Sequence, residues 1–188
     1  VGLAQMAGGT DGNIITYDTS GNPAVVATGS AGQVLTSAGA DAVPTMATLS
    51  AGKVLQVVQT DYTTAGNHGA SSYQDTGLTV TITPSSSSNK VLIMQHQLFA
   101  ITTDTNSARA FYYNICRGST QLFQSVAEYT NQDNTRHSFH GGLIYLDSPS
   151  TTSATTYKTQ TRCNASAADI YYQQGNTSST LTAIEIAG

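Results

Sequence analysis

The pattern of hydrophobic and polar positions changes near residue 51, which separates a repetitive first third from a longer remainder. In the first third, pairs of adjacent aliphatic residues return every 20 residues, each pair two positions after a glycine. The pairs are Ile14-Ile15, Val34-Leu35 and Val54-Leu55, and the glycines are Gly12, Gly32 and Gly52. A fixed short period of this kind predicts stacked structural units rather than one packed core.

Residues 1–51 hold too few apolar side chains to bury a core, so their units must stack on neighbours or on other chains. The Gly/Ala-rich composition is also typical of a disordered linker. The regular spacing favours the ordered alternative, because a linker has no need to keep aliphatic pairs in register. We therefore expect residues 1–51 to form a fibrous shaft. The residues expected to pack between its chains are Ile14, Ile15, Val34 and Leu35.

From Lys53 onward the pattern is that of β-strands separated by polar turns. Leu78, Val80 and Ile82 alternate with threonines, as expected of a half-buried strand. Strands are predicted at Val54–Gln59, Leu78–Thr83, Lys90–Ile101, Ala108–Arg117, Gln121–Val126, His137–Leu146, Thr155–Cys163, Ile170–Gln173 and Thr180–Ile186. Their number and spacing predict an all-β head over residues 52–188, either a β-sandwich or a jelly roll.

The predicted strand from Lys90 to Ile101 is apolar on both of its faces. Leu92, Met94 and Leu98 lie on one face, and Val91, Ile93, Phe99 and Ile101 lie on the other. A strand that is buried on both sides needs a second sheet or another subunit over its outer face. We therefore expect Leu92, Ile93, Met94 and Leu98 to lie in the core or at a subunit contact.

Charge is sparse along the chain, which argues against several functions. Only 10% of residues are charged, the formal net charge is −4, and no Lys or Arg precedes Lys53. Nucleic-acid binding is not expected, because affinity for phosphates rests on clustered cations. Membrane insertion is not expected either, since no apolar run approaches the roughly 20 residues of a membrane span. The first residue is Val1 rather than Met, so we expect a processed chain or the C-terminal part of a longer one.

The two cysteines, Cys116 and Cys163, permit a disulfide, but their spacing does not require one. Two small buried thiols are the simpler interpretation. A structural zinc site is not expected, because the sequence has no CxxC pattern. We predict no cofactor.

Four segments of the chain carry a family resemblance. The first is the stretch GQVLTSAGADAVPT from Gly32 to Thr45. The head contains three more, DTGLTVTITPSSSSNKVLIM from Asp75 to Met94, LDSPSTTSATTYKTQTR from Leu146 to Arg162, and LTAIEI from Leu181 to Ile186. Together these segments resemble tail-fibre and related structural proteins of tailed bacteriophages. The resemblance covers most of the chain and is specific for a style of virion protein rather than for a host or receptor.

The resemblance implies a homotrimer with a slender shaft and a C-terminal knob like the trimeric jelly roll of complement C1q and tumour necrosis factor. It implies a place on the virion after assembly in the host cytoplasm, with other virion proteins bound through the N-terminal end. A tail fibre would carry its head to a bacterial surface receptor, either a polysaccharide or an outer-membrane protein. A capsid head fibre or decoration protein is the alternative, and the resemblance leaves both open.

The histidines do not predict a metal site. Some trimeric phage fibres bind a metal on the threefold axis through an HxH pattern, but His137 and His140 are three apart and point to opposite faces of a strand. His96 fits a sheet or subunit contact, and His68 is expected to be exposed in a glycine-rich turn. No metal is therefore predicted.

Catalytic residues are also scarce. Glu128 and Asp133 are the one carboxylate pair that could face each other across a loop, and neither has an evident neighbour that would tune its pKa. No serine lies in a GxSxG elbow. We predict that the chain is not an enzyme, and a polysaccharide-degrading appendage is the less favoured alternative.

Two tyrosine-rich loops are the candidate receptor-binding segments. Tyrosine offers a rigid apolar face with a hydroxyl, and Asn and Gln both donate and accept hydrogen bonds, which suits sugars or a protein surface. The candidate residues are Tyr129, Asn131, Asn134 and Arg136 in one loop and Tyr171, Tyr172 and Asn176 in the other. The alternative is that these tyrosines pack at the trimer contact and the amides solvate turns.

Overall fold

The computed structural model describes residues 8–48, 52–102, 109–129, 136–164 and 169–188. The chain forms two units, Val1–Ser50 and Ala51–Gly188. Within the described residues, no helix is both long enough and apolar enough to cross a membrane.

The first unit consists of two short β-hairpins. Strand β1 (Ile14–Tyr17) pairs with β2 (Pro23–Val26), and β3 (Gln33–Thr36) pairs with β4 (Thr45–Thr48), both antiparallel. The turn between β1 and β2 is held by Asp18, whose carboxylate accepts hydrogen bonds from the backbone N–H groups of Ser20 and Asn22 at 2.9 and 2.8 Å. The aliphatic pairs Ile14-Ile15 and Val34-Leu35 of the repeat lie in β1 and β3, and the repeat did not predict β4.

The aliphatic pairs of the repeat are not covered within one chain. Ile14, Ile15, Val34 and Leu35 are 37 to 52% exposed, and Val26 is the one buried hydrophobic residue among those described in this unit. Two four-residue strands per hairpin offer little area for packing, which explains why these side chains remain open. The first unit therefore has the exposed apolar surface expected of a shaft whose core needs other chains.

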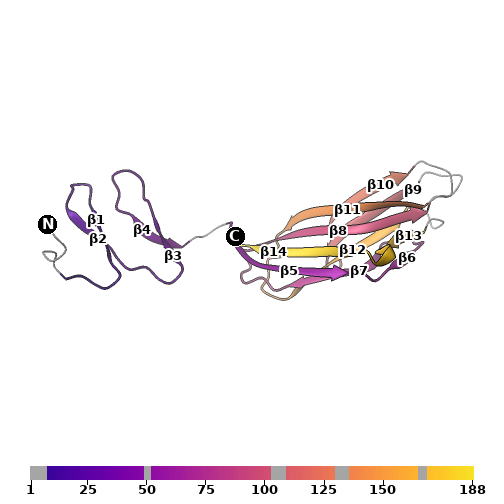
Figure 1. The fold of residues 1–188 in the computed structure, drawn as a ribbon, viewed down its shortest axis with the longest axis horizontal. Helices are drawn as coiled ribbons and strands as arrows, with labels where there is room; N and C mark the ends of the chain where they lie inside the picture. Colours follow the sequence, from indigo (N-terminus) through magenta and orange to yellow (C-terminus); the bar gives the residue numbers. More distant parts are fainter. Residues whose placement is uncertain (1–7, 49–51, 103–108, 130–135, 165–168) are drawn as a thin grey trace. The chain divides into compact units, whose positions relative to one another are not determined.

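The second unit is a sandwich of two antiparallel sheets (Figure 1). Sheet I contains β5 (Val54–Tyr62), β14 (Ser179–Ile186), β8 (Lys90–Thr102) and β11 (Arg136–Asp147), in that order. Two short strands, β13 (Ile170–Tyr172) and β6 (Gly66–His68), extend it beside the second half of β8, and a 3-10 turn, η2 (Gln174–Asn176), follows β13. Sheet II contains β7 (Gln74–Ile82), β12 (Thr155–Cys163), β9 (Arg109–Arg117) and β10 (Thr120–Tyr129).

The strand order makes the head a jelly roll. Counting the eight main strands along the chain, sheet I has the order 1-8-3-6 and sheet II the order 2-7-4-5. This double Greek-key arrangement brings strands from both ends of the head into one sheet. The predicted all-β sandwich is therefore confirmed.

All nine predicted head strands are present, but β6 was missed. Its segment was expected to be an exposed turn, and that prediction was wrong for His68. The ring is half-buried, and its Nε2 lies 2.8 Å from the Thr161 hydroxyl. β6 exists because it pairs with β13, a partner more than 100 positions later in the sequence.

The core lies between the two sheets and is closed by aromatic rings at one end. Phe99, Phe111, Tyr113 and Phe139 form a cluster whose ring centroids are 4.9 to 6.1 Å apart. From β8, the face with Val91, Ile93, Phe99 and Ile101 enters this core, and all four side chains are fully buried. The opposite face of β8 points away from sheet II, and Met94 on that face is 40% exposed.

Strand β5 begins as the third copy of the 20-residue repeat. Gly12, Gly32 and Gly52 all have left-handed backbone conformations, with φ of 81°, 86° and 75°. In the third copy the partner is not the next segment of chain but β14. The Gly52 N–H donates to the Ala187 carbonyl at 3.2 Å, and the Ala187 N–H donates to the Lys53 carbonyl at 2.9 Å. The repeat thus supplies the first strand of the jelly roll.

Candidate functional site

The outer surface of sheet I carries a continuous apolar face. The strand registers place Val57, Ile184, Leu92 and Leu146 in one row across the four strands. The next row contains Gln59, Thr182, Met94 and Ile144. We call Val57, Leu92, Met94, Ile144, Leu146 and Ile184 the apolar face. Four of its members, Val57, Met94, Ile144 and Leu146, are 40 to 63% exposed.

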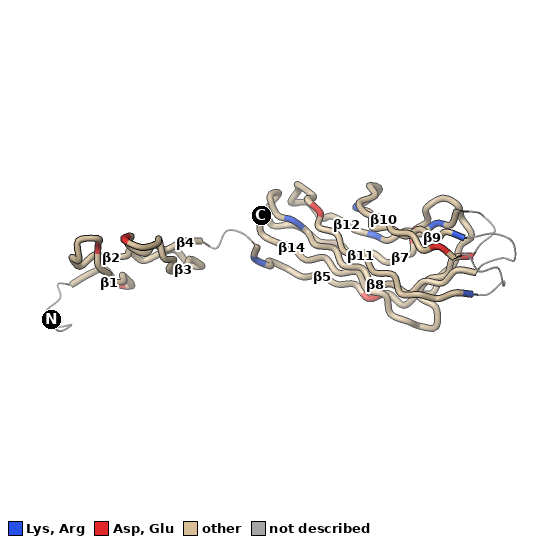
Figure 2. Tube along the Cα trace, turned by 90° about the horizontal axis from the view of Figure 1, so that it is seen from above, with Lys and Arg blue, Asp and Glu red and all other residues tan. Residues whose placement is uncertain are grey.

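Two of the four strands that carry this face, β8 and β11, have charged residues only at their ends. β8 has a charged residue only at Lys90, its first position, and β11 has charges only at its ends, Arg136 and Asp147. Figure 2 shows the same scarcity along the tube. A depression of about 440 Å³ lies in this surface beside Met94, Gly142 and Ile144. An exposed apolar patch with few charges marks a contact surface in soluble proteins.

A pair of stacked histidines borders the apolar face. The rings of His96 on β8 and His140 on β11 have centroids 4.9 Å apart and planes 14° apart. His137 points to the other side of β11, where its ring stacks on Tyr129 with centroids 5.3 Å apart. The prediction that His137 and His140 take opposite faces is confirmed. Among the described residues, no group of three or more His, Cys, Asp or Glu side chains could hold a metal ion.

The structure brings together two of the predicted receptor-binding residues. The Arg136 guanidinium carbon lies 4.1 Å from the centre of the Tyr171 ring, and the Tyr171 hydroxyl donates to an Asp169 carboxylate oxygen at 3.4 Å. Asn131 and Asn134 lie outside the described residues. Arg136, which is exposed, and Tyr171, which is half-buried, therefore form a cation–π pair on sheet I.

The other predicted receptor-binding residues have different surroundings. Tyr129 is half-buried against His137 and Phe139, and burial raises the pKa of its hydroxyl. Tyr172 is also half-buried, and a side chain at Gly66 would collide with its ring. Asn176 is exposed, with a φ of 59° at the end of η2. Tyr129 and Tyr172 thus pack within their own chain, whereas the sequence interpretations placed these tyrosines in an open loop or at a trimer contact.

Two carboxylates of the head are buried among hydrogen-bond donors of the same chain, and the first of them is Asp147. Asp147 accepts hydrogen bonds from Arg117 at 2.8 and 2.9 Å and from the Tyr157 hydroxyl at 2.7 Å. Burial raises the pKa of Tyr157, and its bond to Asp147 raises it further, so this hydroxyl stays protonated. Asp147 and Tyr157 are not accessible to a substrate as a catalytic acid or base, because both side chains are buried.

Glu185 on β14 is the second buried carboxylate. Its Oε1 accepts hydrogen bonds from the Ser85 N–H at 2.6 Å, the Ser85 hydroxyl at 2.9 Å and the Asn89 side-chain amide at 2.5 Å. Its Oε2 accepts one from the Gln56 amide at 2.5 Å. Burial raises the pKa of Glu185, but these bonds outweigh burial and lower it to about 2. The carboxylate therefore ties β14 to β5 and to the turn before β8.

The two cysteines lie on different faces of sheet II as buried free thiols. Burial raises the pKa of Cys116, which makes its thiolate form scarce at neutral pH. Glu128 is exposed on β10, and Asp133, its proposed partner in a hydrolase, lies outside the described residues.

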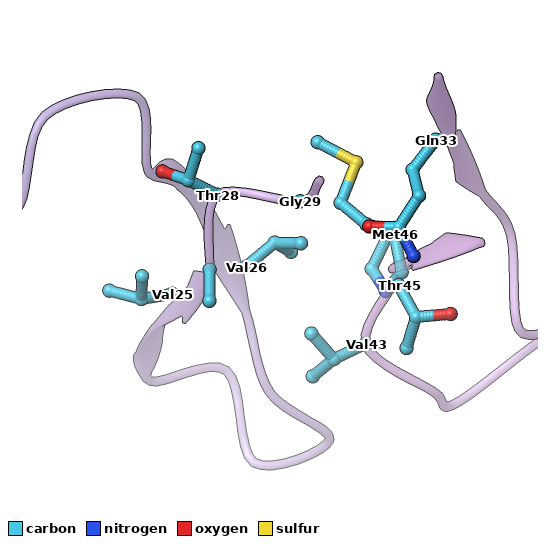
Figure 3. Close-up of a pocket in the computed structure, with 10 residues that line it drawn as sticks. Val25, Val26, Thr28, Gly29, Gln33, Val43, Thr45 and Met46 are labelled. Carbon is cyan, nitrogen blue, oxygen red and sulfur yellow. The ribbon is translucent and has the colours of Figure 1, made fainter. Parts of the chain in front are cut away.

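The first unit contains a groove between its two hairpins (Figure 3). It has a volume of about 380 Å³ and is lined by apolar side chains from both hairpins, together with a few polar ones. The apolar members include Val25, Val26, Val43 and Met46.

Sequence reasoning missed two surface features of the head. Ile144 and Leu146 were grouped into a predicted strand but not into a surface, although their two-residue spacing places both on one face. The second feature is a stack of Tyr73, Arg162 and Tyr112 on sheet II. It has no signal in the sequence, because Arg162 and Tyr112 meet only through the pairing of β12 with β9.

Comparison with known proteins adds only remote likenesses. No protein-family model matches the sequence, and the curated proteins contain no match. A structure of the Gx strain of infectious bursal disease virus matches 87% of this chain and 44% of its own, at 12% identity and a TM-score of 0.34. The T13 particle of the same virus matches 89% of this chain and 43% of its own, at 12% identity and a TM-score of 0.36. Its VP2 subviral particle matches 83% of this chain and 42% of its own, at 12% identity and a TM-score of 0.32. The chain thus spans less than half the length of these viral proteins, and likenesses at this level carry no argument about function.

Proposed function

We propose that this chain is a structural virion protein of a tailed bacteriophage, a homotrimeric fibre subunit whose head contacts the bacterial surface. Its partners would be two further copies of itself, other virion proteins and a surface receptor. The proposal joins the resemblance of the sequence segments to the architecture of a β-hairpin shaft followed by a jelly-roll head. A role in the virion is the broad proposal, and a place on the tail is the narrower one.

The observation that carries the proposal is the apolar face of sheet I. Jelly-roll sheets with one exposed apolar surface need a partner, because single chains rarely leave such a patch in water. The exposed aliphatic pairs of the first unit need partners for the same reason. A second copy of this chain satisfies both requirements at once, since each copy brings the same two apolar surfaces.

Ile144→Asp tests this assembly. Ile144 is 63% exposed in one chain, so the substitution leaves the core of the head intact. In the trimer each copy would bury one unpaired carboxylate, at a cost of about 3–5 kcal/mol per copy. We expect sedimentation near three times 19.6 kDa for the wild type and near one times that mass for the variant.

Thr79→Asp is the matched control, since it adds the same charge on the exposed face of β7 in sheet II. It should leave the trimer intact. A wild-type chain that remains a folded monomer at micromolar concentration, or an Ile144→Asp variant that still sediments as a trimer, would refute the assembly.

The location on the virion needs a separate test. Electron micrographs of virions labelled with an antibody against this chain should show label on the tail. Label on the capsid would instead support the alternative of a head fibre or decoration protein. An assay for reducing sugar released from host surface polysaccharide tests the remaining alternative of an enzyme, and we expect no release.

A further inference from the structure

A stack of two tyrosines around one arginine lies on the outer surface of sheet II. The Arg162 guanidinium carbon lies 3.7 Å from the centre of the Tyr112 ring and 5.3 Å from that of Tyr73. Arg162 and Tyr112 are opposite each other in the pairing of β12 with β9. The Tyr73 hydroxyl donates to the Gln124 side-chain oxygen on β10, which holds this ring in place. The strand pairing therefore places Arg162 beside Tyr112, and the hydrogen bond orients the Tyr73 ring.

Arg162 differs from Arg117 and Lys158 on the same sheet, which have carboxylate partners. Arg117 pairs with Asp147 and Lys158 pairs with Asp75, each at 2.8 Å. Within the part of the chain that the structure describes, Arg162 forms no such ion pair. A guanidinium is a planar fork of five N–H donors, and this fork matches the two oxygens of a carboxylate or phosphate. Arg162 is thus a cation placed beside aromatic rings with N–H donors that suit an anion.

The surroundings of the stack suit a sugar. Val126 lies directly across from Tyr112 in the pairing of β10 with β9 and is 45% exposed, which gives a small apolar platform beside the charge. Gln124 on β10 and Asn164, which directly follows β12, are exposed, and their NH₂ groups can donate hydrogen bonds to hydroxyl groups. A sugar ring has an apolar face and hydroxyl edges, so the platform and the amides complement it.

We propose that the Tyr73–Arg162–Tyr112 stack binds an anionic sugar, with the carboxylate or phosphate on the Arg162 guanidinium and the ring over Val126. The site is built by one chain, so sugar binding does not depend on the trimer. Its role as a receptor contact does rest on the proposed fibre function. Three copies in a trimer would raise the avidity for a repeating surface glycan.

Binding can be measured by NMR titration and calorimetry with four probes: glucuronate, glucose 6-phosphate, glucose and inorganic phosphate. We expect glucuronate or glucose 6-phosphate to bind and to shift the Arg162 and Tyr112 signals, with affinity at least tenfold above that of glucose or inorganic phosphate. The relative affinities of the two anionic sugars distinguish a carboxylated glycan from a phosphorylated one. Equal binding of glucose or of inorganic phosphate would overturn the proposal, as would no binding of either anionic sugar.

Arg162→Gln should weaken binding of the preferred sugar at least tenfold. Lys90→Gln, which removes the same charge from an exposed position on sheet I, should leave binding unchanged. Arg162→Lys keeps the charge but loses the planar fork, and it provides a second variant if Arg162→Gln does not fold. We expect Arg162→Lys to retain part of the affinity, and wild-type affinity in either Arg162 variant would refute the site. Sedimentation of the same samples reports the trimer separately, so the two proposals can fail independently.

Discussion

Glu185→Gln gives the sharpest test of what holds the head together. The substitution keeps the size of the side chain and replaces a carboxylate with an amide. In the wild type, the carboxylate accepts four hydrogen bonds from Gln56, Ser85 and Asn89, and Glu185 is fully buried. The amide has one oxygen and one NH₂ group, so one of these contacts must set two donors against each other.

The expected loss in the free energy of unfolding follows from the hydrogen bonds that change. A hydrogen bond to a charged group contributes about 1.5–3 kcal/mol, and a buried donor without an acceptor costs about 1–3 kcal/mol. The Gln56 amide also donates to the Thr83 carbonyl at 2.8 Å, which limits the loss on that side. We therefore expect Glu185→Gln to lower the free energy of unfolding by about 2–4 kcal/mol at pH 6.

The pH dependence has a definite sign. Glu185 has a pKa of about 2 in the folded chain, against an ordinary value of 4.5, so its contribution is fully present above pH 4.5. That contribution is lost as the pH falls from 4.5 to about 2, because the unfolded chain takes up the proton first. The variant has no carboxylate at this position to titrate. The difference between wild type and variant should therefore shrink on acidification.

Urea unfolding at pH 6, 4 and 3 measures this difference, at one fixed protein concentration because assembly shifts apparent stability. Glu128→Gln is the matched control, since Glu128 is the only other glutamate in the sequence and is exposed. Its effect should be within about 0.5 kcal/mol of zero, as expected of a surface substitution. A Glu185→Gln variant as stable as the wild type at pH 6, or a deficit that does not change with pH, would refute the reasoning.

Other predictions concern packing and boundaries. Gly141→Ala should destabilise the head by about 1–3 kcal/mol in thermal unfolding, because its new methyl group would lie 2.7 Å from a core aromatic ring. Gly142→Ala is the control and should be tolerated, because its methyl group meets nothing closer than 3.5 Å. Tyr157→Phe should cost about 1.5–3 kcal/mol in urea unfolding, since it removes the hydroxyl that donates to Asp147; a loss below 0.5 kcal/mol would contradict this. Limited proteolysis should leave a resistant fragment that begins near Ala51, and early cleavage inside the head with an intact first unit would oppose the division.

Receptor contact through the first tyrosine loop can now be tested one residue at a time. Arg136→Ala should leave stability unchanged while it weakens adsorption to host cells, because Arg136 is exposed and stacks only on Tyr171 in the described structure. Tyr129→Ala should lower the melting temperature, because the ring packs on His137 and Phe139. Normal adsorption by the Arg136 variant would remove this residue from the receptor site.

Much of the fold was predictable because its strands carry their own pattern. The alternation from Leu78 to Ile82 fixes which side of β7 faces the core, and the turn residues between runs fix the strand count. β4 and β6 escaped prediction, since neither has a run of alternating apolar residues. Both exist through pairing with a partner strand, β3 and β13 respectively, and pairing leaves little trace in a single sequence.

The candidate sites were harder to predict for the same reason. The 20-residue repeat and the apolar residues on both faces of β8 predicted apolar surface that one chain does not cover. The exposed side chain of Met94 agrees with that expectation. Whether Tyr129 packs or stays open depends on Phe139, which lies on another strand. The contact of Arg162 with Tyr112 depends on the register of β12 against β9, which composition does not determine.

The place of β14 between β5 and β8 has a consequence for synthesis. Ribosomes make β5 before every other strand of the head, yet its partner β14 follows all the others, with Tyr62 opposite Ser179. Such non-local pairing makes closure of the head a late and slow event. A chain interrupted before residue 179 would leave β5 and β8 with open edges at the same time, since β14 pairs with both. Sheet I therefore cannot form fully until the chain has been made as far as Ile186, because β14 supplies the pairing that closes the edges of β5 and β8.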